Sequence, residues 1–355
     1  MKLIHTSDLH LDSPLTTRLS SDKIRERKRE LIASFKASVE RARALGASGY
    51  LIAGDLFDSE RVSKRVLETV LATVKDAREI TFYYLTGNHE GTMLLNSGLT
   101  LPDNLKLFGE GWTYFEEGDV VIAGRRETDG DMLKTLKLDP KKRNVVVLHG
   151  ELADKCATGG KIGIRELESL PIDYLALGHY HTYSSTRIRD RCTAVYSGTP
   201  EGRGFDEDGD KGIVLVTTDA YGITHEFIKS AYRTLRIISV DVSGLHGSYE
   251  LEKAIENATR GASRADLLRI VLIGERELDE RIDTESLLYT FRHSYYYFEI
   301  KDETKVRISA YDFKSDKSLK GEFIRGVLLD PSLTDKEREK IIETGLAALL
   351  GEAID

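Results

Sequence analysis

The sequence predicts a layered α/β fold, and three observations lead to this prediction. Over the first 230 residues, short apolar runs typical of buried strands alternate with amphipathic stretches typical of helices. Alternation of this kind is the pattern of a sheet covered by helices. The apolar runs end in Gly and polar residues, and 355 residues suffice for two or three domains with at least one large core.

The elements of this first part follow one another at short intervals. We expect buried strands over residues 2–7, 50–53, 80–85, 144–148 and 173–177, with further strands joined by Gly-containing turns over residues 105–123. We expect helices over residues 22–45 and 59–78. In the first helix, Leu31, Phe35 and Val39 recur four residues apart. The basic run 25–29 is predicted to be a solvated face of that helix rather than a DNA-binding patch.

A second, smaller unit is predicted to begin near residue 232. It shows a βαβαββ pattern, with strands over residues 235–242, 267–273, 295–300 and 306–313 and helices over residues 248–262 and 284–292. The aromatic run Tyr295–Phe298 is interpreted as a strand with aromatic residues on both faces, in preference to a base-stacking platform. Two amphipathic helices follow, the second with a capping box formed by Thr334 and Glu337. The predicted domains are therefore 1–231, 232–313 and 314–355.

Composition and charge exclude several classes of protein. The net charge is −8, from 59 acidic and 51 basic residues, which argues against binding of nucleic acid by bulk electrostatics. No apolar run approaches the roughly 18 residues that a membrane span requires. The N-terminus lacks the apolar stretch of a signal peptide, and two cysteines provide no disulfide framework. We therefore expect a cytoplasmic protein that does not bind a membrane.

Five of the predicted strands end in residues that bind metals. The five motifs are Asp8-x-His10, Gly54-Asp55, Gly87-Asn88-His89-Glu90, His149-Gly150 and Gly178-His179-x-His181. Ligands collect outside the carboxyl ends of strands in open α/β sheets, and Gly lets the backbone approach a bound group closely. One such motif is weak support for a site, but five in succession are not accidental.

The chemistry of these side chains points to transition metals. Imidazole, carboxylate and amide oxygen together suit divalent ions such as Mn, Fe, Co or Zn. The donors are too many for one ion with an open position. They suit two ions about 3.5–4 Å apart, which clamp the attacking and leaving oxygens of a phosphoryl displacement.

This ordered set of motifs resembles the calcineurin-like metallophosphoesterase superfamily, and the resemblance covers residues 1 to about 200. It implies a four-layer mixed β-sandwich flanked by helices, in place of the doubly wound sheet that the alternation by itself favours. It also implies two bound divalent ions. Mn²⁺ is the family expectation, with Zn²⁺ or Fe²⁺ as competitors because both bind such donors strongly.

The resemblance further implies a role for each side chain at the strand ends. Three side chains are expected to hold the first metal ion: Asp8, His10 and His181. Three others are expected to hold the second: Asn88, His149 and His179. Asp55 is expected to bridge the two ions. His89 is expected to be a catalytic residue that faces the scissile phosphate, as proton donor or charge stabiliser, without binding metal.

Longer stretches are similar to the SbcD-type branch of DNA repair exonucleases. They are residues 8–14, residues 54–58 and the stretch 196–207, which contains Pro-Glu-Gly-Arg-Gly-Phe-Asp-Glu. This branch implies a small α+β capping domain, C-terminal helices, DNA as substrate, an SbcC-type coiled-coil ATPase as partner and a homodimer. Arg203 is a candidate substrate-binding residue, with fixation of the Gly-Arg-Gly turn as an equal alternative. The C-terminal helices either dock on a partner or pack on their own domain.

Three hypotheses for function follow. The leading one is a two-metal DNA nuclease in which hydroxide bridging the metals attacks phosphorus in line and the sugar 3′-oxygen leaves. The alternative is a phosphodiesterase or phosphatase that acts on small-molecule or protein phosphoesters with the same centre. The third is a binding scaffold with an incidental metal site. The sequence leaves open the metal in the cell, the polarity of cleavage, the ATPase partner and the oligomeric state.

Overall fold

The computed structural model of the protein describes residues 1–15, 19–87, 94, 97–126, 128, 131–155, 160–189, 191–277, 280–307 and 316–349. The chain forms two compact units, Met1–Leu235 and Arg236–Asp355. The first unit carries four of the five predicted metal-binding strand ends among its described residues.

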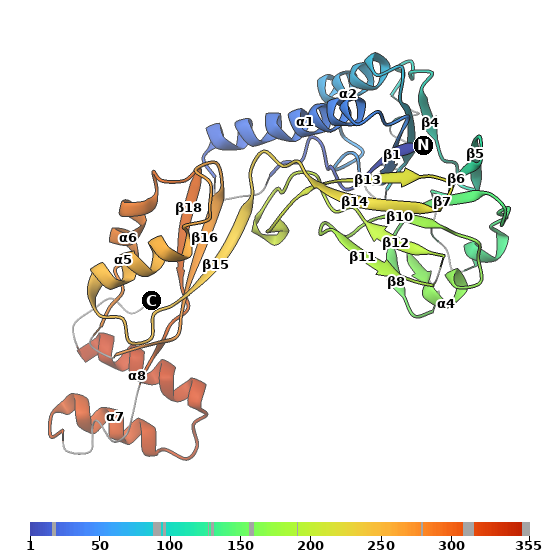
Figure 1. The fold of residues 1–355 in the computed structure, drawn as a ribbon. Coiled ribbons are helices and arrows are strands. Elements are labelled where there is room, and N and C mark those ends of the chain that lie inside the picture. Colours follow the sequence, from blue (N-terminus) through green and yellow to red (C-terminus); the bar gives the residue numbers. More distant parts are fainter. Residues whose placement is uncertain are drawn as a thin grey trace. The chain divides into compact units, whose positions relative to one another are not determined.

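Two six-stranded sheets form the centre of the first unit (Figure 1). The first has the order β14-β13-β1-β2-β3-β4, with strands β1 (Lys2–Thr6), β2 (Gly49–Ala53), β3 (Thr81–Leu85), β4 (Leu105–Leu107), β13 (Gly212–Thr218) and β14 (Ile223–Lys229). The second has the order β11-β12-β10-β7-β6-β5, with strands β5 (Thr113–Glu117), β6 (Val120–Gly124), β7 (Arg143–His149), β10 (Tyr174–Gly178), β11 (Ser184–Arg187) and β12 (Thr193–Tyr196). Both sheets are mixed: β1, β2 and β3 are parallel, as are β7 and β10, while β13 and β11 are antiparallel to their neighbours.

The sheets pack face to face around one apolar core, and helices cover their outer faces. Alternate residues of β1, β2, β7 and β10 fill the space between the sheets, among them Leu3, Leu51, Val147 and Ala176. Helices α1 (Ser21–Ala44) and α2 (Lys64–Asp76) cover the first sheet, where they form a second cluster. Helix α4 (Ile164–Leu167) and the 3₁₀ turn η1 (Met132–Thr135) cover the other sheet. The predicted mixed, helix-flanked β-sandwich is therefore confirmed, and the doubly wound alternative is wrong.

Helix α1 follows its sequence pattern in length but not in the placement of its charges. Ser20 caps it by accepting a hydrogen bond from the Lys23 amide, and Leu31, Phe35 and Val39 are buried against the sheet. The basic run was expected to be solvated, yet Arg27 is only 2% exposed. Its guanidinium pairs with Glu201, 2.8 Å away, so an acid 174 residues further along the chain draws it inward.

Helix α2 begins at Lys64, five residues later than expected. The Ser63 amide donates to the Asp12 carboxylate at 2.7 Å, and the Arg61 amide donates to the Ser59 hydroxyl. These bonds hold residues 59–63 against the loop that follows β1, so the helix starts only after them. The described part of this unit also contains β8 (Glu151–Ala153), β9 (Lys161–Gly163) and the 3₁₀ turn η2 (Phe205–Glu207).

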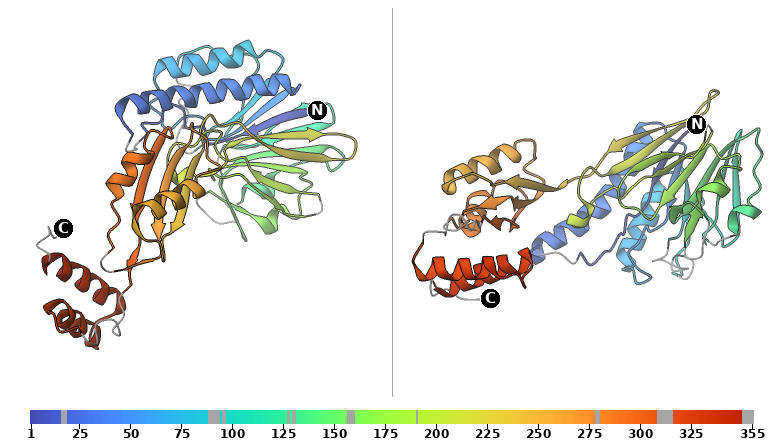
Figure 2. Two further views of the ribbon diagram at one scale, coloured as in Figure 1. Left: turned by 60° about the vertical axis from the view of Figure 1, so that its left-hand side comes forward. Right: turned by 90° about the horizontal axis from the view of Figure 1, so that it is seen from below.

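The second unit is a small sheet with helices on one face (Figure 2). Its elements are β15 (Leu235–Asp241), α5 (Gly247–Ala258), β16 (Leu267–Ile273), β17 (Glu275–Arg276), α6 (Thr284–Phe291), β18 (Tyr297–Asp302) and β19 (Lys305–Val306). The order is β15-β16-β18, and β17 pairs separately with β19. Tyr295 and Phe291 both stack on the buried Phe298 ring, so this end of the aromatic run belongs to the core.

Two C-terminal helices pack against one another. Helix α7 (Leu319–Leu329) and helix α8 (Asp335–Leu349) share a small cluster of Ile324, Ile342 and Leu346. The predicted capping box is present, because Glu337 accepts from the Thr334 amide at 2.8 Å. Leu319, the first residue of α7, is 72% exposed. Among the described residues, no helix is both long and apolar enough to cross a membrane.

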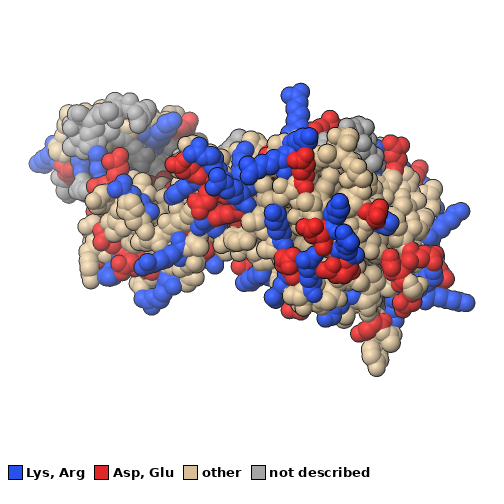
Figure 3. Space-filling model, turned by 90° about the horizontal axis from the view of Figure 1, so that it is seen from above, with Lys and Arg blue, Asp and Glu red and all other residues tan. Residues whose placement is uncertain are grey.

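Charged side chains of both signs are interspersed over the face that Figure 3 shows. Lys and Arg residues alternate there with Asp and Glu residues instead of forming one broad field of either sign. A large basic surface of the kind that binds nucleic acid by bulk charge is therefore not a feature of this face.

Candidate metal centre

The loops after β1 and β2 run side by side and carry three of the predicted metal ligands. The Asp8 amide donates to the Gly54 carbonyl and the His10 amide donates to the Asp55 carbonyl, both at 3.0 Å. A further bond joins Leu11 to Leu56 at 2.9 Å. Parallel pairing thus continues past the ends of the two strands, and it brings Asp8, His10 and Asp55 to one edge of the first sheet.

The loops after β7 and β10 bring the histidines of the second sheet to the same place. Strands β7 and β10 are parallel, with Gly178 opposite His149 in register. The His179 amide donates to both oxygens of the Asp8 carboxylate at 3.1 Å. One backbone group of the second sheet therefore holds a carboxylate of the first.

Two groups of side chains form at this junction, and Asp8 belongs to both. Asp8, His10 and His181 form one group, and Asp8, Asp55 and His149 form the other, with the ligand atoms of each group within 4.8 Å of one another. The first group contains the three residues that the sequence assigned to a first metal ion. Five of the seven predicted ligands thus meet in the described structure.

Asp55, a member of the second group, also approaches the first. Its Oδ2 atom is 3.8 Å from Nε2 of His10 and 3.4 Å from Nε2 of His149. The Nε2 atoms of His10 and His181 are 3.3 Å apart, and the rings of His149 and His179 lie edge to face with 5.6 Å between their centroids. One carboxylate oxygen therefore faces histidines of both groups, as a bridging ligand must.

The hydrogen bonding of His149 fits a metal ligand. Its Nδ1 atom lies 2.9 Å from the Ala53 carbonyl, an acceptor that requires a proton on Nδ1. In the neutral ring the lone pair is then on Nε2, which is buried and faces the Asp55 carboxylate at 3.4 Å. Metal-binding histidines donate their other ring nitrogen in this way. The residues present therefore fit a divalent cation at this point.

Backbone strain is concentrated at the same residues. Among the described residues other than Gly, six have positive φ, and four of them are predicted ligands: Asp8 (53°), His10 (44°), Asp55 (50°) and His179 (108°). Such conformations are costly and persist where the surrounding structure enforces them, commonly at functional sites.

Three glycines at the strand ends are required by close packing around the ligands. A Cβ atom on Gly54 would lie 2.1 Å from Nδ1 of His149, and one on Gly87 would lie 1.9 Å from Oδ1 of Asp55. A Cβ atom on Gly178 would lie 1.9 Å from the Ala53 carbonyl oxygen. The Gly residues of the strand-end motifs therefore leave space that the ligand residues and the backbone beside them occupy.

Burial and neighbouring charges shift the pKa values of three residues at the site. Burial raises the pKa of the Asp8 carboxyl above its usual value. Burial, together with the Arg203 cation, lowers the pKa of His10 to about 3. For His149, burial opposes protonation, but the Asp55 and Asp8 carboxylates outweigh it and raise the pKa to about 9. Buried carboxylates that draw a proton onto a neighbouring imidazole form an environment in which a divalent cation is stabilised.

Arg203 lies beside His181, with its Nη2 atom 3.4 Å from Nδ1 of that ring. Its guanidinium donates to Asp58 at 2.9 Å and to Glu207 at 2.6 Å, and Glu207 in turn contacts His181. The substrate-binding role considered for Arg203 stays a prediction. Sequence reasoning missed Asp58 and Glu207, although both stand in the quoted stretches. An acid a few residues from a ligand motif was the only local signal.

Two predicted site residues lie outside the described residues. They are Asn88, assigned to the second metal ion, and His89, assigned to catalysis; Glu90 lies outside as well. Their roles stay predictions. Gly87, directly before them, is described and packs against Asp55.

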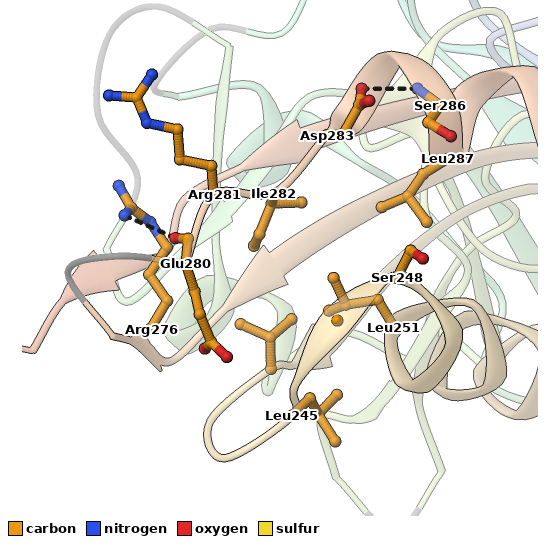
Figure 4. A pocket seen from close by; sticks show the side chains of 12 residues that line it. Leu245, Ser248, Leu251, Arg276, Glu280, Arg281, Ile282, Asp283, Ser286 and Leu287 are labelled. Carbon is orange, nitrogen blue, oxygen red and sulfur yellow. Dashed lines mark hydrogen bonds between the residues drawn. The ribbon is translucent and has the colours of Figure 1, made fainter. Parts of the chain in front are cut away.

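The second unit contains a separate pocket of about 470 Å³ (Figure 4). Its apolar lining includes Leu245, Leu251, Ile282 and Leu287, and its charged lining consists of Arg276, Glu280, Arg281 and Asp283. The two arginines and two acids balance, and Asp283 caps α6 by accepting from the Ser286 amide. The pocket therefore indicates no particular class of ligand.

Comparison with known proteins gives a family for the first half of the chain. Residues 1–183 match the family model described as calcineurin-like phosphoesterase. The uncharacterized metallophosphoesterase YhaO of Bacillus subtilis is 24% identical over 274 residues, covering 72% of this chain and 67% of that protein. The DNA double-strand break repair protein Mre11 of Methanopyrus kandleri is 24% identical over 294 residues, covering 72% of this chain and 62% of that protein.

Two solved structures are similar at a lower level. Thermus thermophilus TT1561 has a TM-score of 0.44 at 12% identity, covering 64% of this chain and 98% of that chain. A dimetal phosphatase from Danio rerio has a TM-score of 0.41 at 11% identity, covering 65% of this chain and 99% of that chain.

Proposed function

The chain belongs to the calcineurin-like phosphoesterase family of metal-dependent phosphoester hydrolases, and from this premise we propose that it is a DNA nuclease. It hydrolyses phosphodiester bonds with the help of two divalent ions, and the expected metal is Mn²⁺. Of the proposed ligands, Asp8, His10 and His181 would hold one ion, and Asn88, His149 and His179 would hold the other. Asp55 lies between them.

The observation that supports the choice of DNA is the similarity to the Mre11 DNA repair protein. The family model covers residues 1–183, about half of the chain, whereas the alignment with the Mre11 repair protein covers 72% of the chain. The alignment therefore includes residues beyond those that the family model matches. The small α+β unit after residue 235 agrees with the capping domain that the SbcD-type branch implies.

The chain's own residues prepare the site for an anionic substrate. Asp8, His10 and Asp55 are each at most 3% exposed, so the charges lie in a region from which water is largely excluded. Bound divalent ions supply positive charge there and activate water as the nucleophile. Positive charge at this one place attracts a phosphodiester even though the whole chain carries a net charge of −8. The His179 amide and the Ser7 hydroxyl both donate to Asp8 and keep its oxygens aimed at the site.

The partners that we propose follow from the same branch resemblance. They are DNA, a coiled-coil ATPase of the SbcC type and a second copy of this chain. Helix α7 presents Leu319 and Leu329, which are 72% and 75% exposed, and such side chains suit a partner surface. Sedimentation of the full chain, with and without a DNA duplex, measures the homodimer directly.

Incubation with nucleic acid tests the nuclease proposal. The purified protein is given Mn²⁺ and either end-labelled duplex DNA, end-labelled single-stranded DNA or bis-p-nitrophenyl phosphate. We expect DNA to be degraded, and degradation to stop when a chelator removes the metal. Cleavage of the small diester without degradation of DNA would overturn the proposal in favour of the alternative, a phosphodiesterase or phosphatase on other phosphoesters.

A further inference from the structure

We propose that Arg203 is a positioning residue that holds two carboxylates, Glu207 and Asp58, against the outward nitrogens of His181 and His10. This inference rests on the metal centre of the proposed function, but not on DNA as the substrate. It gives a role to the stretch 201–211, which the reaction itself does not use.

Every nitrogen of the Arg203 guanidinium contacts another residue of the site. Nη1 donates to Oδ1 of Asp58 at 2.9 Å. Nε and Nη2 donate to Oε1 of Glu207 at 3.0 and 2.6 Å, and the Arg203 amide donates to Oε2 of the same carboxylate at 2.7 Å. The planar fork of arginine suits a residue that must fix two carboxylates at once.

Each of these carboxylates faces the outer ring nitrogen of one histidine. Oε1 of Glu207 lies 2.7 Å from Nδ1 of His181, and Oδ1 of Asp58 lies 3.3 Å from Nδ1 of His10. The Nε2 atoms of the same two rings face one another, 3.3 Å apart, on the inner side. A carboxylate on the outer nitrogen of a metal-binding histidine sets its tautomer and orientation. The shorter contact makes Glu207 the stronger of the two supports.

The backbone of His181 is held by the same stretch of chain. The ammonium group of Lys211, a residue that is only 2% exposed, donates to the His181 carbonyl at 2.8 Å. The Thr199 amide donates to the same carbonyl at 3.3 Å. His181 is therefore fixed at its ring and at its backbone, and both supports come from residues 199–211.

Burial explains why arginine is needed here. Glu207 is 2% exposed, and a carboxylate at that depth is costly unless a cation and hydrogen bonds compensate it. Arg203, with 17% of its side chain exposed, supplies both. Without it, Glu207 would lose the contacts that keep it against His181.

Glu201 offers a matched control within the same stretch. It is 1% exposed, as deeply buried as Glu207, and it also pairs with an arginine. Its partners are Arg27 and the amides of Tyr232 and Arg233, and none of these is a predicted ligand. Substitution of Glu201 therefore removes a buried ion pair without touching the metal site.

Metal binding by variants of the full chain tests the proposal. The variants are Arg203→Met, Arg203→Lys, Glu207→Gln, Asp58→Asn and Glu201→Gln, titrated with Mn²⁺ by calorimetry and with Co²⁺ by visible absorption. We expect Glu207→Gln and Arg203→Met to weaken binding of one ion about 10- to 100-fold and to change the Co²⁺ spectrum. Arg203→Lys should also weaken metal binding, because one ammonium group cannot bind both carboxylates. Asp58→Asn, at a partly exposed position, should weaken binding about tenfold and keep the fold.

The control variant Glu201→Gln and the kinetics with DNA distinguish a positioning role of Arg203 from other roles. Glu201→Gln should lower the melting temperature of the metal-free protein while metal affinity stays at the wild-type value. Wild-type metal affinity and spectrum in Glu207→Gln and Asp58→Asn would overturn the proposal. A higher KM for DNA in Arg203→Met with unchanged metal binding would also overturn it, because Arg203 would then contact substrate. Failure of the wild-type protein to cleave DNA would remove the proposed nuclease function, whereas weakened metal binding in the variants would still support the positioning role.

Discussion

His149 and His181 both lie close to the Asp8 carboxylate, but they are supported in different ways. His149 donates from Nδ1 to a backbone carbonyl, that of Ala53, in a space that Gly54 and Gly178 leave open. His181 faces the Glu207 carboxylate, which Arg203 secures. One side of the site therefore depends on how closely two strands approach, and the other depends on charged side chains. Substitutions should separate the two sides.

A substitution at Asp55 should break both sides at once and have the largest effect. Asp55→Asn keeps the shape but removes the charge that faces histidines of both groups. We expect kcat/KM for bis-p-nitrophenyl phosphate to fall at least about 100-fold, which corresponds to about 2.7 kcal/mol of transition-state stabilisation. The bound metal, measured by elemental analysis, should fall with it.

Asp103→Asn, at an exposed position, provides the control for loss of one negative charge. It should keep wild-type activity and metal content. If Asp55→Asn bound the same amount of metal with full activity, Asp55 would not join the two groups.

A methyl group at Gly178 should break the backbone-supported side alone. In Gly178→Ala the new Cβ atom would meet the Ala53 carbonyl oxygen at 1.9 Å and Nδ1 of His149 at 2.7 Å. We expect the free energy of unfolding to fall by about 2 kcal/mol, as for other overpacked sites, and metal affinity at His149 to fall as well. Denaturant unfolding and metal titration measure the two effects.

Gly111→Ala is the matched control, because a Cβ atom there would have no neighbour within 4 Å. It should change neither the free energy of unfolding nor the metal affinity. Equal losses in the two variants would show that the backbone preference of Ala over Gly, and not crowding at the site, explains the result.

Acid should lower the stability of the β-sandwich through His5. This is the smallest of the three expected effects. His5 is buried, and its Nδ1 atom lies 2.9 Å from the Tyr174 hydroxyl of the other sheet. Burial lowers its pKa from 6.5 to about 3. The folded state then binds fewer protons than the unfolded state between these values. The stability that His5 contributes is therefore present above pH 6.5 and is lost as the pH falls from 6.5 towards 3.

Urea unfolding at pH 7.5 and pH 5.5 measures this contribution in the wild type and in His5→Gln. Between pH 7.5 and pH 5.5, the free energy of unfolding of the wild type should fall by about 1.4 kcal/mol more than that of the variant. The lower pH lies one unit below the unfolded-state pKa of 6.5, and one unit corresponds to about that energy. The same pH dependence in both proteins would contradict the assignment of acid sensitivity to His5.

Several features of the fold and of the site were predictable because they depend on neighbouring residues. Strands β1, β2, β7 and β10 each contain a short apolar run and stop at Gly or polar residues, so their ends could be located. The metal-binding residue types stand directly after those ends. The capping box at Thr334 needs only a residue three positions away.

Other features depended on partners far away in the sequence, and only the tertiary structure decided them. Arg27 is buried because Glu201 lies against it, and Asp58 belongs to the site because Arg203, 145 residues later, reaches it. The supports of His149 and His181 also differ only because the sheets bring different groups beside them. Periodicity and residue type are local properties that a sequence displays. The burial of a charge depends on which distant partner compensates it, and that is settled only when the chain has folded.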